Sequence, residues 1–326
     1  MTAVLDVQGL TVEFPTRRGT LTAVDHISFS IGEGEVLGVV GESGAGKSLT
    51  GTAVIGLLEP PGRIAAGEVR LAGKRIDNLA YEELRRIRGR EIGMVFQDPL
   101  TSLNPLYTVG RQLMETIRTH TDMGEKAARD RAIEMLAEVG IPEPRRRIDQ
   151  YPHQFSGGMR QRVVIAIALL ARPRLIIADE PTTALDVTIQ SQILKLMRQQ
   201  IAEKGASMIL ITHDLAVVSE MADHITVLYC GKVVERGRTR ELIETPAHPY
   251  TRGLIDSIPD TAHRHDRLRQ IPGSIPDIRN LPTGCNFRDR CPRAQALCAE
   301  REPDLARQHA TLWAACHFPL KPGETA

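Results

Sequence analysis

A glycine-rich octapeptide constrains the fold of this 326-residue chain more than any other feature. Residues 41–48 read Gly-Glu-Ser-Gly-Ala-Gly-Lys-Ser and fit the spacing G-x-x-x-x-G-K-[ST]. The run before it, Val36 to Val40, is β-branched and bounded by glycines, which is typical of a buried parallel strand. A helix should begin near Gly46. The sequence therefore predicts a strand, a phosphate-binding loop and a helix in direct succession.

The chemistry of phosphate binding explains each residue type in this loop. Glycines let backbone N–H groups approach and surround phosphates, and the helix N-terminus adds a partial positive charge. A lysine places a compact charge on the β- and γ-phosphates, and the serine hydroxyl can ligate Mg²⁺. A glycine-rich turn that binds nothing is the alternative, and the flanking strand and helix argue against it. The predicted ATP-binding residues are Gly41, Ser43, Gly44, Gly46, Lys47 and Ser48, with Ser48 also a Mg²⁺ ligand.

A second chemical element is an apolar strand that ends in two carboxylates. Leu175 to Ala178 is followed directly by Asp179 and Glu180. A strand end beside the phosphate loop is where Mg²⁺ coordination would need Asp179, and Glu180 would then polarise the attacking water as general base. The alternative, an exposed acidic strand end, is common by itself but is disfavoured by the phosphate loop.

The composition excludes some classes of protein. The chain has 41 basic and 40 acidic residues, so its charge gives no reason to expect a nucleic-acid partner. No stretch approaches the roughly 18–20 apolar residues that a membrane helix needs. The N-terminus lacks a basic start followed by an apolar core, so a signal peptide is not expected. We therefore expect a protein that is made and kept in the cytosol.

The order of patterns along the chain predicts an α/β fold. Strands are expected over Leu5 to Phe14, Leu21 to Val24, Ile92 to Phe96 and Met208 to Ile211, in addition to those above. Their alternation with helical patterns predicts a mostly parallel sheet covered by helices. Three helices without strands (Val109–His120, Glu125–Val139, Gly158–Leu170) predict a helical subdomain inserted over about 106–170. Proline and glycine become frequent from Pro246, which places a boundary near residue 245 between a nucleotide-binding domain (1–245) and a C-terminal domain (246–326).

The segment Phe155-Ser156-Gly157-Gly158-Met159-Arg160-Gln161-Arg162 closely resembles the signature sequence of the ABC ATPases, a variant of L-S-G-G-Q. Four further elements follow the order of that family. Gln97 resembles the Q-loop glutamine, Asp186 the D-loop aspartate and His213 the switch histidine, while Phe14 takes the place of the aromatic that stacks on adenine. Taken alone, His213 would read as a structural histidine, Ser156 as a helix cap and Phe14 as a core aromatic. The resemblance covers residues 1 to about 245 and implies a RecA-like P-loop nucleotide-binding domain.

The family resemblance also implies a mechanism. Ser156, Gly157 and Gly158 would face the γ-phosphate held by a second ATPase subunit, so two ATP molecules would lie in a head-to-tail dimer. Gln97 would sense the shell of Mg²⁺ and water, and His213 would contact the γ-phosphate. The retained Lys47, Asp179, Glu180 and His213 argue against a non-catalytic cassette. A soluble ABC ATPase of DNA repair or translation is the alternative enzyme class, and the chain shows none of the second cassette, coiled coil or basic insertions typical of it.

Two further segments resemble the peptide-importer branch of the family. These are the run Asp98 to Pro105 and the tail motif His248 to Leu254. The resemblance is to a D-type ATPase of dipeptide and oligopeptide importers, which implies a related F-type ATPase, two permease subunits and an extracytoplasmic solute-binding protein as partners. The chain itself would then be peripheral, on the cytoplasmic face of the inner or plasma membrane. Importers of nickel, glutathione or other solutes share much of this branch.

Four of the five cysteines, Cys285, Cys291, Cys298 and Cys316, crowd the last 42 residues. In a reducing cytosol such a group suggests metal or iron–sulfur ligation more than disulfides. The spacing lacks the paired knuckles typical of zinc sites, and four cysteines match the ligand count of a [4Fe–4S] cluster. The resemblance to D-type ATPases points to the same cluster. Zinc and reduced packing cysteines stay open, and Cys230, in a strand-like run, is expected to be core.

Overall fold

The computed structural model describes residues 3–182, 185–258 and 270–324, and these residues form two compact units. The first unit comprises Met1–Val4, Gly32–Glu35 and Asn78–Ile209. The second comprises Leu5–Ile31, Val36–Asp77 and Leu210–Ala326. Among the described residues, no helix combines the length and the apolar character that crossing a membrane requires. The predicted boundary near residue 245 stays a prediction.

The second unit contains a four-stranded antiparallel sheet. Its order is β2-β1-β4-β5, built from β1 (Leu5–Thr16), β2 (Gly19–Ile31), β4 (Arg63–Leu71) and β5 (Lys74–Arg75). The two residues between Thr16 and Gly19 close the hairpin of β1 and β2. The predicted strands over Leu5–Phe14 and Leu21–Val24 are confirmed, and β2 runs on to Ile31.

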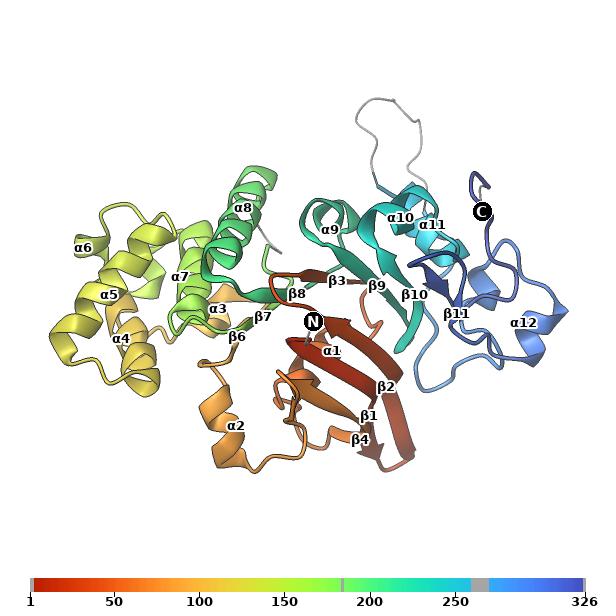
Figure 1. Ribbon diagram of the computed structural model, residues 1–326, viewed down its shortest axis with the longest axis horizontal. Coiled ribbons are helices and arrows are strands. Elements are labelled where there is room, and N and C mark those ends of the chain that lie inside the picture. The colour runs from red at the N-terminus through yellow and green to blue at the C-terminus, as the bar shows by residue number, and fades with distance from the viewer. Residues whose placement is uncertain (1–2, 183–184, 259–269, 325–326) are drawn as a thin grey trace. The chain divides into compact units, whose positions relative to one another are not determined.

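The phosphate loop follows a strand of the eight-stranded sheet, part of which belongs to this unit (Figure 1). Its central strand β3 (Val36–Val40) is buried at every residue and pairs in parallel with β9 (His224–Tyr229). A tight turn connects β9 to the antiparallel β10 (Lys232–Arg238). The C-terminal part, by which we mean residues 246–258 and 270–324, adds β12 (Trp313–Ala314) and β11 (Ala306–Arg307) beyond β10. The helices of this unit are α1 (Lys47–Val54), α9 (Leu215–Met221), α10 (Thr239–Glu244), α11 (Pro249–Asp256), the short 3-10 helix η2 (Arg288–Arg290) and α12 (Ala296–Glu300).

The first unit combines parallel strands with most of the helices. β6 (Ile92–Val95) pairs in parallel with β7 (Leu175–Asp179). β8 (Ser207–Thr212) is next to β7 in the sheet; its residues up to Ile209 belong to this unit, and the rest belong to the second. The helices are α2 (Tyr81–Ile87), α3 (Pro99–Ser102), α4 (Val109–His120), α5 (Glu125–Glu138), α6 (Pro144–Arg147), the 3-10 helix η1 (Pro152–Gln154), α7 (Gly157–Leu169) and α8 (Val187–Lys204).

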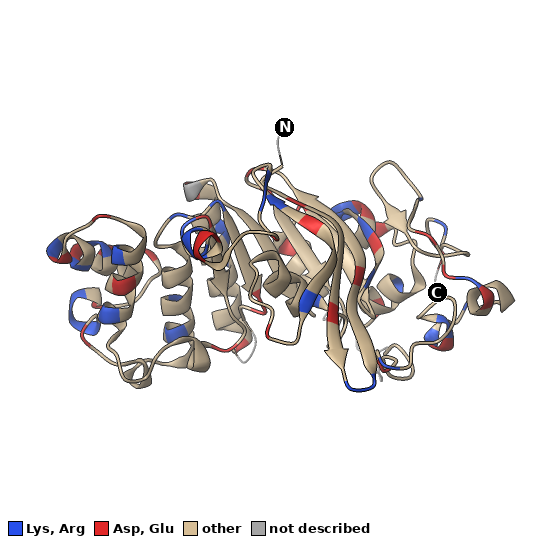
Figure 2. Ribbon diagram, turned by 90° about the horizontal axis from the view of Figure 1, so that it is seen from below, with Lys and Arg blue, Asp and Glu red and all other residues tan. Residues whose placement is uncertain are grey.

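Figure 2 shows that acidic and basic positions are interleaved along the ribbon.

The three helices predicted between residues 106 and 170 are present as α4, α5 and α7. α4 begins where the Thr108 hydroxyl accepts the N–H of Arg111, and it buries Val109, Leu113 and Ile117 at the spacing of one helix face. α4, α5 and α7 contact one another, as Figure 1 shows in yellow to green. The helical pattern of the sequence thus predicted these three helices closely.

The structure corrects one sequence-based expectation and confirms another. The mixed α/β fold contains more antiparallel pairing than the mostly parallel sheet that was predicted, because tight hairpins join β1 to β2 and β9 to β10. Cys230 lies in the second of these turns, directly after β9, and its side chain is buried, so the prediction that it belongs to the core is confirmed. Cys230 and Gly231 both have positive φ, 47° and 78°, as a two-residue turn of the mirror-image type requires.

Candidate nucleotide site

The phosphate loop follows β3 and has a backbone path that glycine makes possible. Gly41, Gly44 and Gly46 have φ of 153°, 84° and 96°. A Cβ on Gly41 would lie 2.3 Å from the carbonyl oxygen of Leu228, so the loop passes directly over β9. The N–H of Gly231 in the following turn donates to the carbonyl of Ala45 at 3.0 Å. The turn between β9 and β10 therefore supports the phosphate loop through this hydrogen bond.

Lys47 closes the loop around its own ammonium group. Its Nζ donates to the carbonyl oxygens of Gly41 at 2.7 Å and Glu42 at 3.0 Å, and the residue is only 5% exposed. Gly46, the residue that precedes α1, offers no side chain to cap the helix. A helix start that lacks a side-chain cap is a common binding site for anions. Ser43 and Ser48 are exposed beside them.

The first unit holds the predicted carboxylates at the end of β7. Asp179 is 6% exposed, and Glu180 has the positive φ of 46° that is unusual for a residue with a side chain. Gln97, two residues after the neighbouring β6, donates from Nε2 to Oε2 of Glu180 at 2.9 Å. The structure thus brings Gln97 and Glu180 together across 83 residues of sequence. Strained backbone at a strand end that carries reactive groups is common in functional sites.

The signature segment forms the start of α7 in the first unit. Ser156 is the N-cap residue, and its hydroxyl accepts the N–H of Met159 at 3.4 Å. Ser156 and Gly157 are exposed, whereas Gly158 is close to α8, where a Cβ would lie 2.8 Å from Cγ2 of Ile189. Gly158 is therefore required for packing, while Gly157 has room for a side chain on this chain.

The remaining predicted residues begin helices or end strands. Asp186 caps α8 by accepting the N–H of Ile189 at 2.9 Å, whereas the adjoining D-loop residues Thr183 and Ala184 lie outside the described residues. His213 is exposed directly after β8 and before Asp214, the N-cap of α9. Phe14 is half-buried in β1, against Gly62. Phe14, the phosphate loop and His213 belong to the second unit; Gln97, Asp179, Glu180, the signature segment and Asp186 belong to the first.

Two residues of the C-terminal part contact the phosphate loop, and neither contact was predicted. Arg290 pairs with the loop residue Glu42, and the hydroxyl of Tyr250 accepts the N–H of Glu42. Both partners are more than 200 residues from the loop. No local pattern could have revealed them, because only the folded chain brings them to Glu42.

The four predicted cysteines line one small, mostly closed cavity of the second unit. Cys285, Cys291, Cys298 and Cys316 share it with His248, Phe287 and Phe318. Burial, reinforced by the neighbouring thiols, raises the pKa of Cys285 and Cys291, and it raises the pKa of Cys316 to about 12. Within the described residues, however, no three His, Cys, Asp or Glu side chains are arranged to hold a single metal ion. All five cysteines are free thiols.

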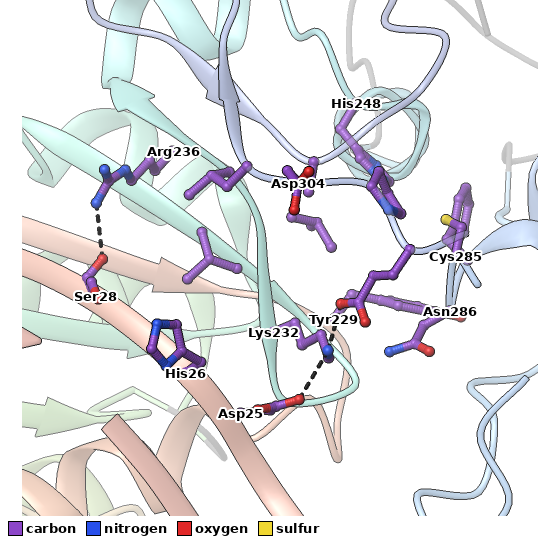
Figure 3. Close-up of a pocket in the computed structure, with 17 residues that line it drawn as sticks. Asp25, His26, Ser28, Tyr229, Lys232, Arg236, His248, Cys285, Asn286 and Asp304 are labelled. Atoms are coloured by element: carbon purple, nitrogen blue, oxygen red, sulfur yellow. Dashed lines mark hydrogen bonds and ion pairs between the residues drawn. The ribbon is translucent and has the colours of Figure 1, made fainter. Parts of the chain in front are cut away.

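A larger cavity of about 440 Å³ lies beside this one, between β2, β10 and the C-terminal part (Figure 3). Lys232 reaches across it from β10 to Asp25 of β2, at 2.9 Å, and also contacts Glu302. Figure 3 shows His248 and Cys285 lining it as well. None of the phosphate-loop residues lines this cavity, so it is a cavity between parts of the second unit and not the nucleotide site.

Comparison with protein families gives two matches along the chain. Residues 24–183 match the family model described as ABC transporter, and residues 234–298 match the model described as oligopeptide/dipeptide transporter, C-terminal region. The dipeptide transport ATP-binding protein DppD of Haemophilus influenzae is 47% identical over 318 residues, which cover 98% of this chain and 96% of the relative. The oligopeptide transport ATP-binding protein OppD of Escherichia coli is 47% identical over 301 residues, covering 92% and 89%.

Solved structures give the same relationship. An ATP-binding cassette solved as a dimer in a post-hydrolysis state, bound to ADP and Pi, matches with a TM-score of 0.66 and 30% identity, covering 72% of this chain and 99% of that one. The cbiO1 protein of Clostridium perfringens, part of the ABC transporter complex cbiONQ, matches with a TM-score of 0.63 and 30% identity, covering 74% and 91%. The part of this chain that these shorter structures leave uncovered is more than a quarter of its length.

Proposed function

This chain belongs to the ABC transporter family of ATPases, and from that premise we propose that it hydrolyses ATP to drive the import of dipeptides or oligopeptides. The observation that carries the proposal is the phosphate loop, with Lys47 enclosed by the loop and an uncapped helix start behind it. The match of residues 234–298 to the peptide-transporter C-terminal region supports peptides as the cargo.

The proposed roles of the site residues follow from their chemistry. The loop residues Gly41, Ser43, Gly44, Gly46 and Lys47 would bind the ATP phosphates, and Phe14 would stack on the adenine. Mg²⁺, when bound, neutralises charge on the phosphates, and Ser48, Gln97 and Asp179 are the residues suited to hold it. Glu180 would accept the proton of the attacking water, and the amide of Gln97 at 2.9 Å would hold its carboxylate in place. His213 would donate to the γ-phosphate.

We assign the exposed start of α7 to the ATP of a second ATPase subunit. Ser156 and Gly157 are exposed, so their hydroxyl and N–H groups can reach a phosphate that this chain does not itself hold. Asp186, at the start of α8, packs beside this helix and would face the same subunit interface. The dimeric cassette among the solved relatives is consistent with this arrangement.

The remaining partners follow from the importer role. Two membrane permeases would carry the peptide, and a related F-type ATPase would complete the head-to-tail dimer. An extracytoplasmic solute-binding protein would deliver the cargo. The chain would then be peripheral, held by the permeases at the cytoplasmic face of the inner or plasma membrane.

Two experiments test this proposal. Purification of the tagged chain from its own membranes should recover two permeases and a second ATPase; recovery of ribosomes or DNA would contradict it. In the purified complex Lys47→Ala should abolish ATP binding, whereas the surface control Lys126→Ala should bind like the parent. Uptake of labelled dipeptides, with Ni²⁺ and glutathione as competing cargoes, then identifies the solute.

We also propose that the four-cysteine cavity binds a [4Fe–4S] cluster. Four thiols around one cavity supply the ligand number of such a cluster, which is wider than a single ion and is ligated by cysteines farther apart. When bound it would cross-link four segments of the C-terminal part and so stabilise its fold.

Anaerobic purification tests the cluster directly. The parent should carry about four irons per chain with broad absorbance near 400 nm, as expected for this cluster type. Cys298→Ala should lose them, and the matched control Cys230→Ala, whose thiol lies outside the cavity, should keep them. An iron-free parent that is fully folded would defeat the idea; stoichiometric zinc would replace it.

A further inference from the structure

The phosphate loop contains an acidic residue that phosphate binding does not explain. Glu42 follows the first glycine of the loop, and its backbone carbonyl accepts from Lys47. Its carboxylate is paired with Arg290, 248 residues further along the chain. The two guanidinium nitrogens contact the two carboxylate oxygens separately, Nη1 to Oε2 at 2.6 Å and Nη2 to Oε1 at 2.9 Å. This bidentate geometry is the strong form of an arginine–carboxylate pair.

The C-terminal part holds Arg290 rigidly in this position. The side chain is only 4% exposed, compared with 33% for Glu42. Its Nε donates to the carbonyl of Pro272 at 2.9 Å, and its guanidinium lies within 6.0 Å of the rings of Tyr229 and Phe287. The hydrogen bond with Glu42 raises the pKa of Arg290 further, so the charge is permanent. Pro272, Tyr229 and Phe287 thus hold the guanidinium independently of the loop, so Arg290 can position the carboxylate of Glu42.

A second residue of the same part supports the loop backbone. The hydroxyl of the fully buried Tyr250 accepts the N–H of Glu42 at 2.9 Å. The Tyr250 ring packs against Tyr229 and Phe287, with ring centroids 4.7 Å and 5.3 Å away. The backbone of Glu42 is therefore held by Tyr250 and its side chain by Arg290, and both of these residues pack against Tyr229 and Phe287. Arg290 itself ends η2, directly before Cys291 of the four-cysteine cavity.

We propose that Arg290 is a positioning residue of the ATP site, which neutralises Glu42 and thereby permits the phosphate loop to bind a polyanion. An unpaired carboxylate in a phosphate-binding loop would repel the nucleotide, because two negative charges would share a site partly shielded from water. The C-terminal part thus sets the ATP affinity of a loop to which it contributes no phosphate contact. This inference rests on the proposed ATP site.

A four-variant cycle on the full chain in its purified complex tests this role. ATP affinity and the KM and kcat of ATP hydrolysis are measured for the parent, Arg290→Met, Glu42→Gln and the double variant. We expect Arg290→Met to weaken ATP binding about tenfold, since the repulsion is partly screened by solvent. Glu42→Gln should bind ATP at least as well as the parent. The double variant should recover to within about threefold of Glu42→Gln, since it no longer carries the repelling charge. The change should fall on KM and not on kcat, because Arg290 touches no reacting atom.

The controls separate charge from folding. Arg293→Met removes a neighbouring arginine whose partner is Glu324, and it should leave ATP affinity unchanged. Arg290→Lys keeps the charge and should restore most of the affinity. Equal losses in Arg290→Met and the double variant would overturn the proposal, because the lost contacts to Pro272 and Tyr229 would then be the cause. Parent-like affinity in Arg290→Met would overturn it too. Lys47→Ala, measured in parallel, distinguishes these results from failure of the ATP site itself.

Discussion

The phosphate loop and the C-terminal part of the second unit contribute to one site in contrasting ways. The loop is eight consecutive residues whose glycines and lysine act through backbone geometry that the chain forms locally. The C-terminal part acts through Tyr250 and Arg290, two side chains that reach the loop only after the fold is complete. A phosphate site can thus bind its ligand through neighbouring residues and still be supported by residues far away in the sequence.

The glycines of the signature segment test whether local sequence encodes packing or function. Gly158→Ala would place a methyl group 2.8 Å from Ile189, so it should lower the free energy of unfolding by about 1–3 kcal/mol. Gly157→Ala meets nothing closer than Leu185 at 4.0 Å and should leave stability unchanged while lowering ATP turnover in the complex. Chemical denaturation and turnover assays measure the two effects. Equal destabilisation by both variants would show that packing alone explains this segment.

The buried Glu235 of β10 contacts the C-terminal part and should make stability depend on pH. Its Oε1 and Oε2 accept the N–H groups of Ala247 and His248 at 2.6 Å and 3.1 Å, and burial raises its pKa from 4.5 to about 7. The folded state thus binds more protons than the unfolded state between these values, so this carboxyl destabilises the fold as pH rises from 4.5 to 7. The free-energy difference between the parent and Glu235→Gln should change by about 1.4 kcal/mol per pH unit across that window. Denaturation series at several pH values measure it; a constant difference would mean that Glu235 does not titrate there.

The smallest effect on stability is expected at the cavity in Figure 3. Lys232 bridges Asp25 and Glu302, but the lysine side chain is 27% exposed and Asp25 is 40% exposed. Lys232→Met should therefore lower stability by about 1 kcal/mol or less and leave ATP affinity unchanged. This variant contrasts with Arg290→Met, which breaks the part-buried pair on the loop. A tenfold loss of ATP affinity in Lys232→Met would show that general loosening of the C-terminal part, and not the charge of Glu42, controls the loop.

The same division explains what the sequence could predict. Helix α4 was predicted at both ends because its helical pattern is contained in a few consecutive residues. The carboxylates after β7 and the loop after β3 were predicted for the same reason. The antiparallel pairing of β9 with β10 was missed. It depends on the tight turn at Cys230, and the positive φ of this residue becomes visible only in the folded chain. The pairing of Arg290 with Glu42 was also missed, because neither residue type nor spacing marks a contact across 248 residues.

ATP hydrolysis by this chain should depend most directly on Glu180, the residue proposed to activate water. The decisive measurement is ATP turnover and ATP retention by Glu180→Gln in the assembled complex. A lost general base should reduce turnover by about 10²–10⁴-fold, while ATP stays bound because the phosphate loop is intact. The matched exposed variant Glu134→Gln should hydrolyse ATP like the parent. Undiminished turnover in Glu180→Gln would contradict the assignment of this chain's own site as the place of hydrolysis.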